Sequence, residues 1–153
     1  MREIKFRAWD GLEMEYNILV GKFGAFYVNP SNNGLDPNDS SSINPHNTKY
    51  TGRYPLMQYT GHKTLKDREL YEGDIVFVED TDDDKDVRHY LVIVWVHEWS
   101  MFASLHLFEY IKFIDMGYSA LDESMFWTYT LQNSERDFHY AGNIYENPEL
   151  IKV

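Results

Sequence analysis

The chain has 153 residues, of which 43% are hydrophobic and 25% charged. A chain of this length buries enough surface to build its own core, and this composition argues against disorder throughout. It contains no cysteine, which excludes disulfides, thiolate nucleophiles and zinc sites that need sulfur. The net charge of −11 opposes binding to nucleic-acid phosphates unless basic residues cluster on one face. We therefore expect a single domain over residues 1–153, with nucleic acid a disfavoured partner.

Nothing in the sequence predicts a membrane segment. The first twenty residues carry seven charged side chains, and no apolar run reaches the length of a membrane-spanning helix. We therefore expect a cytoplasmic protein with no membrane partner.

The N-terminal third predicts short strands followed by a long loop. Residues 3–9 alternate apolar and polar side chains, as in a half-buried strand that ends at an Asp10-Gly11 turn. Two further short strands are expected at 14–20 and 24–28. Residues 31–49 are rich in Ser, Asn, Asp, Gly and Pro, which predicts a long mobile surface loop within the domain.

The central segment predicts a strand hairpin. The expected elements are a strand at 56–59, a polar excursion with a short helical turn at 60–70, a turn at 71–74, a strand at 75–78, an Asp-rich hairpin connection at 79–86 and a strand at 90–96. The last strand, YLVIVWV, is apolar on both faces, which is typical of the middle of a sheet.

The C-terminal third is less uniform. Residues 104–113 suit a helix and a strand equally well, and both alternatives stay open. Residues 125–131 and 138–144 are aromatic and β-branched, which predicts strands. Residues 142–150 suit a tight turn closed by one helical turn that starts at Pro148.

These elements together predict a mainly β fold with minor helix. The aromatic content of 16% favours sheet. The segment GDIVFV, followed by an acidic hairpin and a buried strand, suits an SH3-like barrel, in which Gly73 and Asp74 form the turn that feeds the first long strand.

The motifs that resemble catalytic or metal sites all fail in detail. His97 is followed four residues later by Met101, where a zinc-protease helix needs a second histidine. Asp80, Asp82 and Asp84 have calcium-loop spacing, but the required glycine and the bidentate glutamate are missing. No Gly-x-Ser-x-Gly elbow occurs. The six histidines have no ligand-like spacing; they are His46, His62, His89, His97, His106 and His139. We therefore predict no enzyme, and assign no catalytic, cofactor-binding or metal residue.

Three sequence boxes, taken together, resemble the YopX family of phage and prophage proteins. They are REIKFRAWD at residues 2–10, MQYTG at 57–61 with LYEGDIV at 70–76, and GNIYENPEL at 142–150. The resemblance implies a phage or prophage reading frame, a β-barrel-containing fold and self-association, and it implies no catalytic residue. The chain departs from the family pattern at residues 62–67, where the hairpin differs in length or turn type.

Three hypotheses for function follow. The first is a non-enzymatic, homo-oligomeric interaction or accessory protein. The second is an acidic regulator that binds a host nucleic-acid-processing protein. The third is direct nucleic-acid binding through basic residues near the boxes, namely Arg2, Lys5, Arg7, Lys63, Lys66 and Arg68.

Overall fold

The structure is a computed structural model, and it describes residues 3–16, 18–21, 24–28, 48–50, 55–80, 87–131 and 137–152. The chain forms two compact units, Met1–Tyr59 and Thr60–Val153. Strand β6 (Leu56–Lys63) passes from the first unit into the second.

In the first unit, β1 (Phe6–Trp9) pairs antiparallel with β2 (Met14–Glu15) on one side and with the start of β6 on the other. The predicted turn at Asp10-Gly11 is confirmed. The Asp10 carboxylate accepts hydrogen bonds from the backbone amides of Leu12 and Glu13 at 2.8 and 2.9 Å. Gly11 has a φ of 101°, which a residue without a Cβ adopts at little cost.

The first unit also contains a three-stranded sheet in the order β3-β4-β5. Its strands are β3 (Ile18–Gly21), β4 (Gly24–Val28) and β5 (Thr48–Tyr50). The single strand expected at 14–20 is therefore two strands, β2 and β3. The loop expected at 31–49 is too long, because its last two residues lie in β5 and pair with β4. Residues 31–47 lie outside the described residues.

In the second unit, the end of β6 lies beside β7 (Glu69–Tyr71). The polar excursion expected at 60–70 is shorter than predicted, because residues 60–63 belong to β6 and residues 69–70 to β7. Residues 64–68 lie outside both strands and contain a turn, in which the Asp67 amide donates to the Thr64 carbonyl at 2.9 Å. The reason for the longer strands is a polar contact that periodicity does not show. The Thr60 hydroxyl donates to the Leu70 carbonyl at 2.8 Å, so a buried polar side chain is satisfied between two strands.

The main sheet of the second unit has the antiparallel order β10-β9-β8-β11. Its strands are β8 (Asp74–Asp80), β9 (Val87–Val96), β10 (Met101–His106) and β11 (His139–Asn143). The predicted β8–β9 hairpin and the central place of β9 are confirmed, with pairing from Ile75↔Val92 to Asp80↔Val87. The strand expected at 138–144 is β11. The segment from His97 to Met101, which starts like a zinc-protease helix, is no helix: residues 97–100 form the β9–β10 turn and Met101 begins β10.

Each face of this sheet packs against its own apolar cluster, because neighbouring residues of β9 point to opposite sides. Val92, Val94 and Val96 belong to one cluster, and Leu91 and Ile93 to the other. Both clusters include residues with no exposed surface, so β9 is buried on both faces as its sequence predicts.

The helices follow β10. Helix α1 (Leu107–Met116) resolves the ambiguity at 104–113, since the segment starts as strand and continues as helix. The strand expected at 125–131 is wrong; it is mostly helix α2 (Phe126–Tyr129), and only Thr130 forms a bridge, with Ala103. The helical turn expected near 147–150 is confirmed as a 3-10 helix, Pro148–Ile151.

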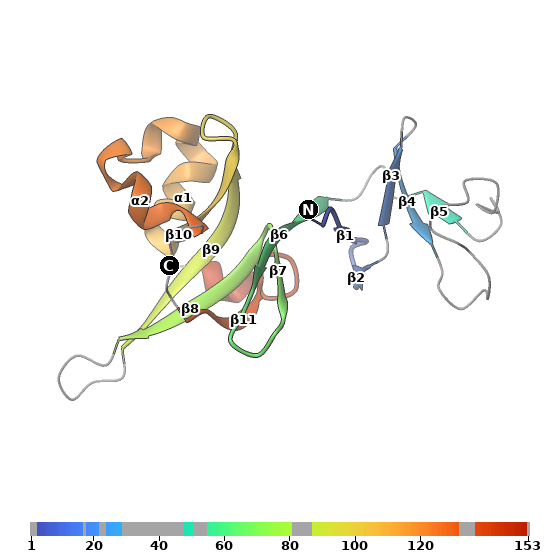
Figure 1. Ribbon diagram of the computed structural model, residues 1–153, viewed down its shortest axis with the longest axis horizontal. Coiled ribbons are helices and arrows are strands. Elements are labelled where there is room, and N and C mark those ends of the chain that lie inside the picture. The colour runs from blue at the N-terminus through green and yellow to red at the C-terminus, as the bar shows by residue number, and fades with distance from the viewer. Residues whose placement is uncertain are drawn as a thin grey trace. The chain divides into compact units, whose positions relative to one another are not determined.

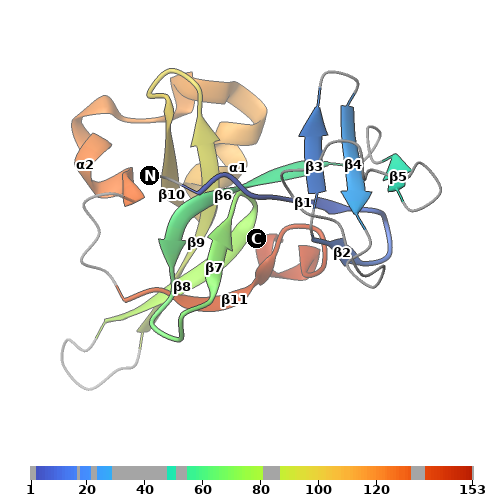
Figure 2. The ribbon, with the colours of Figure 1, turned by 45° about the vertical axis from the view of Figure 1, so that its right-hand side comes forward.

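Both helices lie at the end of the main sheet that carries the β9–β10 turn, as Figure 1 shows. The ends of β8 and β9 at Asp80 and Val87 lie at the opposite end, and the turned view in Figure 2 agrees. The fold is thus mainly β with minor helix, as predicted. The SH3-like barrel and the single domain stay predictions. Among the described residues, no helix combines the length and the apolar character needed to cross a membrane.

Candidate functional site

The central sequence box forms a tight turn that joins β7 to β8. Asp74 is fully buried, and its carboxylate accepts a hydrogen bond from the Tyr71 amide at 2.8 Å. Gly73 has a φ of 81°, and its amide donates to the Ile93 carbonyl at 2.8 Å. Gly73 and Asp74 therefore have the turn roles that the sequence predicts.

The C-terminal box forms a second turn around the fully buried Asn143. Its side-chain oxygen accepts hydrogen bonds from the amides of Tyr145 and Glu146 at 3.0 and 2.9 Å, and its side-chain nitrogen donates to the Glu146 carboxylate. The Ile144 amide donates to the Gly73 carbonyl at 2.9 Å, so the two boxes meet. The most distinctive polar residues of the sequence thus satisfy backbone groups in turns.

An aromatic cluster surrounds Trp99, which lies in the β9–β10 turn. Its ring lies edge-to-face with Phe126 at 4.9 Å and with Tyr118 at 5.7 Å, and stacks with Tyr129 at 6.1 Å. The indole N–H donates to the Tyr118 hydroxyl at 3.0 Å, and that hydroxyl donates to Glu123 at 2.6 Å. The bond to Glu123 raises the pKa of Tyr118. Trp99 occupies the centre of these rings, so the cluster is packing and not an aromatic cage.

Glu109 connects α1 to this cluster. One carboxylate oxygen accepts from the buried Tyr129 hydroxyl at 2.7 Å, and the other accepts from the His106 amide at 3.1 Å, which caps the first turn of α1. Burial, and then the bond to Glu109, raise the pKa of Tyr129 to about 12. A tyrosine held protonated in this way is a structural donor rather than a general base.

The structure brings two histidines together. The rings of His89 on β9 and His106 at the end of β10 lie 6.0 Å apart between centroids, with an interplanar angle of 86°. His139 stacks on Phe77 at 4.9 Å, and His97 is exposed in the β9–β10 turn. His62 is half-buried on β6, and His46 lies outside the described residues. The sequence does not indicate the His89–His106 pair, because strand register alone creates it.

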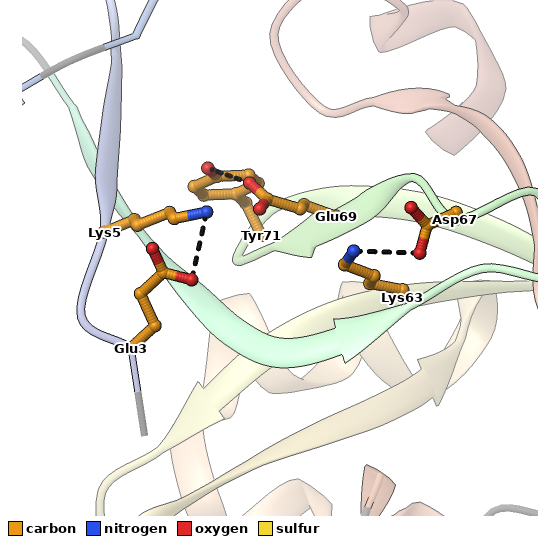
Figure 3. Close-up of polar contacts among 6 residues, drawn as sticks. All are labelled: Glu3, Lys5, Lys63, Asp67, Glu69 and Tyr71. Carbon is orange, nitrogen blue, oxygen red and sulfur yellow. Dashed lines mark hydrogen bonds and ion pairs between the residues drawn. The ribbon is translucent and has the colours of Figure 1, made fainter. Parts of the chain in front are cut away.

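The basic residues proposed for nucleic-acid binding are largely engaged elsewhere. Arg7 is buried, with 1% of its surface exposed. Lys5 lies 3.2 Å from the Glu3 carboxylate, and Lys63 lies 2.8 Å from that of Asp67; Figure 3 shows both contacts together with the hydrogen bond from Tyr71 to Glu69.

The remaining three members of that basic set differ in their surroundings. The exposed Arg68 lies over the Tyr140 ring, with its guanidinium carbon 3.3 Å from the centroid. Lys66 is exposed, and Arg2 lies outside the described residues. A phosphate surface built from this set would have to break existing carboxylate contacts.

Three carboxylates lie close together near the β1–β2 turn, a cluster that their spacing in the sequence does not indicate. Asp10, Glu13 and Glu15 offer oxygens within 4.8 Å of one another. The Asp10 carboxylate already accepts the two backbone hydrogen bonds of the β1–β2 turn, so turn formation accounts for its position. Most of the Asp-rich segment with calcium-loop spacing lies outside the described residues.

The outward side of α1 carries large exposed apolar side chains. Phe108 and Ile114 are each 62% exposed, and Met116 is 57% exposed. The half-buried Ile111 lies between the first two in sequence. Because residues three apart are neighbours on a helix, Phe108, Ile111 and Ile114 form one continuous stripe, which we call the α1 stripe.

Together these features define a mainly β protein whose distinctive polar residues build turns and whose longest helix presents an apolar stripe. The family model described as "YopX protein" matches residues 5–152, so the chain belongs to the YopX family. This confirms the family indicated by the three sequence boxes.

The fold has a counterpart among solved structures. The chain is similar to the crystal structure of protein EF1440 from Enterococcus faecalis, with a TM-score of 0.53 and 21% sequence identity over 99% of this chain and 100% of that one. At this identity the likeness shows the fold alone. No curated protein matches the chain.

Proposed function

We propose that this chain is a non-enzymatic interaction protein of phage or prophage origin that associates with copies of itself in the host cytoplasm. The observation that carries the proposal is the α1 stripe. Large apolar side chains exposed side by side on a helix are typical of interaction surfaces in proteins that work as assemblies.

The sequence boxes support a non-enzymatic role. In the described residues, the buried polar side chains of the central and C-terminal boxes bond to backbone groups or, for Asn143, also to Glu146; they are Thr60, Asp74 and Asn143. The residues that mark the family can therefore be explained by the turns that they build, without assigning a catalytic group.

The test is the mass of the particle in solution. Light scattering after size exclusion is expected to give a multiple of 18.2 kDa for the unmodified chain. The double variant Phe108→Ser with Ile114→Ser is expected to elute as a single chain, because it removes apolar area from the stripe.

A matched control distinguishes the stripe from general surface hydrophobicity. Leu65 is 59% exposed and lies in the β6–β7 connection, so Leu65→Ser removes a similar exposed apolar side chain from another place. This variant is expected to keep the mass of the unmodified protein. An 18.2 kDa particle for the unmodified chain at all concentrations would contradict self-association.

A further inference from the structure

Two exposed charged side chains lie beside the apolar residues of the α1 stripe. They are Lys112 and Asp115, and both are on the solvent side of α1. The Lys112 ammonium lies over the ring of Phe108, one turn earlier in the helix, at 4.2 Å from the centroid. Asp115 follows Ile111 by one turn, so it lies on the same side of the stripe as Lys112. One border of the stripe therefore carries one positive and one negative charge.

In the part of the chain that the structure describes, neither of these two charges has an ion-pair partner. The third charged residue of α1 is Glu109, whose carboxylate bonds to the Tyr129 hydroxyl and to the His106 amide. The exposed side of α1 is thus electrically balanced, although the whole chain carries a net charge of −11. A basic partner would meet a lysine beside the exposed carboxylate of this helix. A second copy of the chain offers an opposite charge to each.

Antiparallel packing of α1 against the α1 of a second copy matches the apolar and the charged residues together. In a dimer with two-fold symmetry both copies use the same surface, so each contact occurs twice. A two-fold axis that crosses the stripe near Ile111 sets Phe108 of one copy opposite Ile114 of the other. It also keeps Lys112 and Asp115 on the same border of the contact. Because side chains lean toward the N-terminus of their helix, these two lean toward each other across antiparallel helices.

From this arrangement we propose that α1 forms the contact of a symmetric dimer in which Lys112 of each copy pairs with Asp115 of the other. The proposal rests on the self-association given above as the proposed function, and it adds the geometry of the contact. Loss of apolar surface to water supplies the attraction, while the ion pairs at the rim select the antiparallel register and a second copy as the partner. An exposed ion pair contributes little affinity by itself, so its effect is largest when one charge is reversed.

Charge reversal tests the two ion pairs. In Lys112→Glu the new carboxylate meets Asp115 of the other copy, and in Asp115→Lys the new ammonium meets Lys112. Each variant alone is expected to associate at least about tenfold more weakly than the unmodified chain in sedimentation velocity at about 0.1 M salt, because both contacts become like-charged. An equimolar mixture of the two variants is expected to recover the dimer, since every charged contact between them again joins opposite charges.

Matched controls change the net charge by the same amount at other places. Lys66→Glu in the β6–β7 connection and Glu98→Lys in the β9–β10 turn each reverse an exposed charge outside α1. Each control is expected to associate as the unmodified chain does, and mixing the two controls is expected to change nothing. Recovery of the dimer in the mixture of the two α1 variants also shows that both of them fold.

The possible outcomes separate this proposal from the proposed function. If Phe108→Ser with Ile114→Ser gives single chains while both α1 charge reversals associate as the unmodified chain does, the stripe holds the copies together and the ion-pair geometry is wrong. Weaker association of both variants without recovery in their mixture would overturn the geometry as well. If the unmodified protein is a single chain at every concentration, self-association fails, this proposal fails with it, and the stripe has a different partner.

Discussion

Gly142 has too little space for an added side-chain carbon. A Cβ at this position would lie 2.3 Å from the side-chain oxygen of Asn147. That oxygen accepts from the Asn143 amide at 3.3 Å, so moving it away breaks a contact of the C-terminal turn. We expect Gly142→Ala to lower the free energy of unfolding by about 1 to 3 kcal/mol, measured by urea denaturation.

The cause of that loss can be separated by a double-mutant cycle. In the background of Asn147→Ala the obstructing oxygen is gone, so the added methyl group of Gly142→Ala is expected to cost less. Equal costs in both backgrounds would show that contact with Asn147 is not the reason.

Tyr129 makes stability depend on alkaline pH. Its pKa is raised from 10.0 to about 12 by burial and by the bond to Glu109. A raised pKa in the folded chain means that the protonated hydroxyl stabilises the fold fully below pH 10, and that this stabilisation is lost as the pH rises toward 12. Tyr129→Phe is expected to reduce the fall in unfolding free energy at alkaline pH. Urea denaturation between pH 9 and pH 11 measures this fall; the window extends about one unit on either side of the ordinary tyrosine pKa. A fall of the same steepness in both proteins would contradict this role.

At the scale of elements, α2 depends on the ring of Trp99. The helix has only four residues, so its own hydrogen bonds are too few to hold it without packing. Trp99→Ala removes the ring contacts with Phe126 and Tyr129 and the hydrogen bond to Tyr118. We expect faster amide hydrogen exchange in 126–129, with β8 and β9 still protected.

The control for this variant is in the same turn. His97 is exposed, so His97→Ala changes the β9–β10 turn without touching the aromatic cluster. It is expected to leave exchange in α2 unchanged. If Trp99→Ala and His97→Ala accelerate exchange equally, the turn and not the indole supports α2.

Strands with a regular or continuous apolar pattern were predictable from sequence. Strand β9 is apolar on both faces and is buried on both, and the Gly73 turn was found from its glycine and aspartate. The segment 125–131 was not predictable, because its aromatic and β-branched residues favour strand locally. Phe126 and Tyr129 instead share one side of a helix, three residues apart, and both contact Trp99.

In the candidate sites, too, contacts within one segment were predictable from sequence, and contacts between distant segments were not. The turn roles of Gly73 and Asp74 follow from their residue types, and the structure confirms both roles. The His89–His106 pair and the Tyr129–Glu109 bond join segments that are far apart in sequence, and only strand register and helix packing bring them together. The charge of Arg7 suggested an exposed side chain that could bind nucleic acid, but the side chain is buried, and the alternating strand pattern did not indicate this.

At the scale of the whole molecule, the net charge of −11 and the apolar α1 stripe act against each other during self-association. Copies of the chain repel one another at low ionic strength, whereas the stripe attracts through loss of apolar surface to water. Salt screens the repulsion, with a Debye length near 10 Å at about 0.1 M, and leaves the apolar attraction in place. We therefore expect the assembled fraction to rise with sodium chloride at fixed protein concentration, measured by sedimentation velocity.

The same titration separates self-association from the acidic-regulator hypothesis. Binding of a basic host protein to the acidic surface would weaken as salt rises, because charge attraction is its driving force. The variant with Phe108→Ser and Ile114→Ser is expected to stay a single chain at every salt concentration. Salt can screen the repulsion between copies, but without the apolar attraction of the α1 stripe nothing holds them together. Dissociation of the unmodified assembly by salt would instead mean that charged contacts hold the copies together, and the α1 stripe would then lose its assigned role.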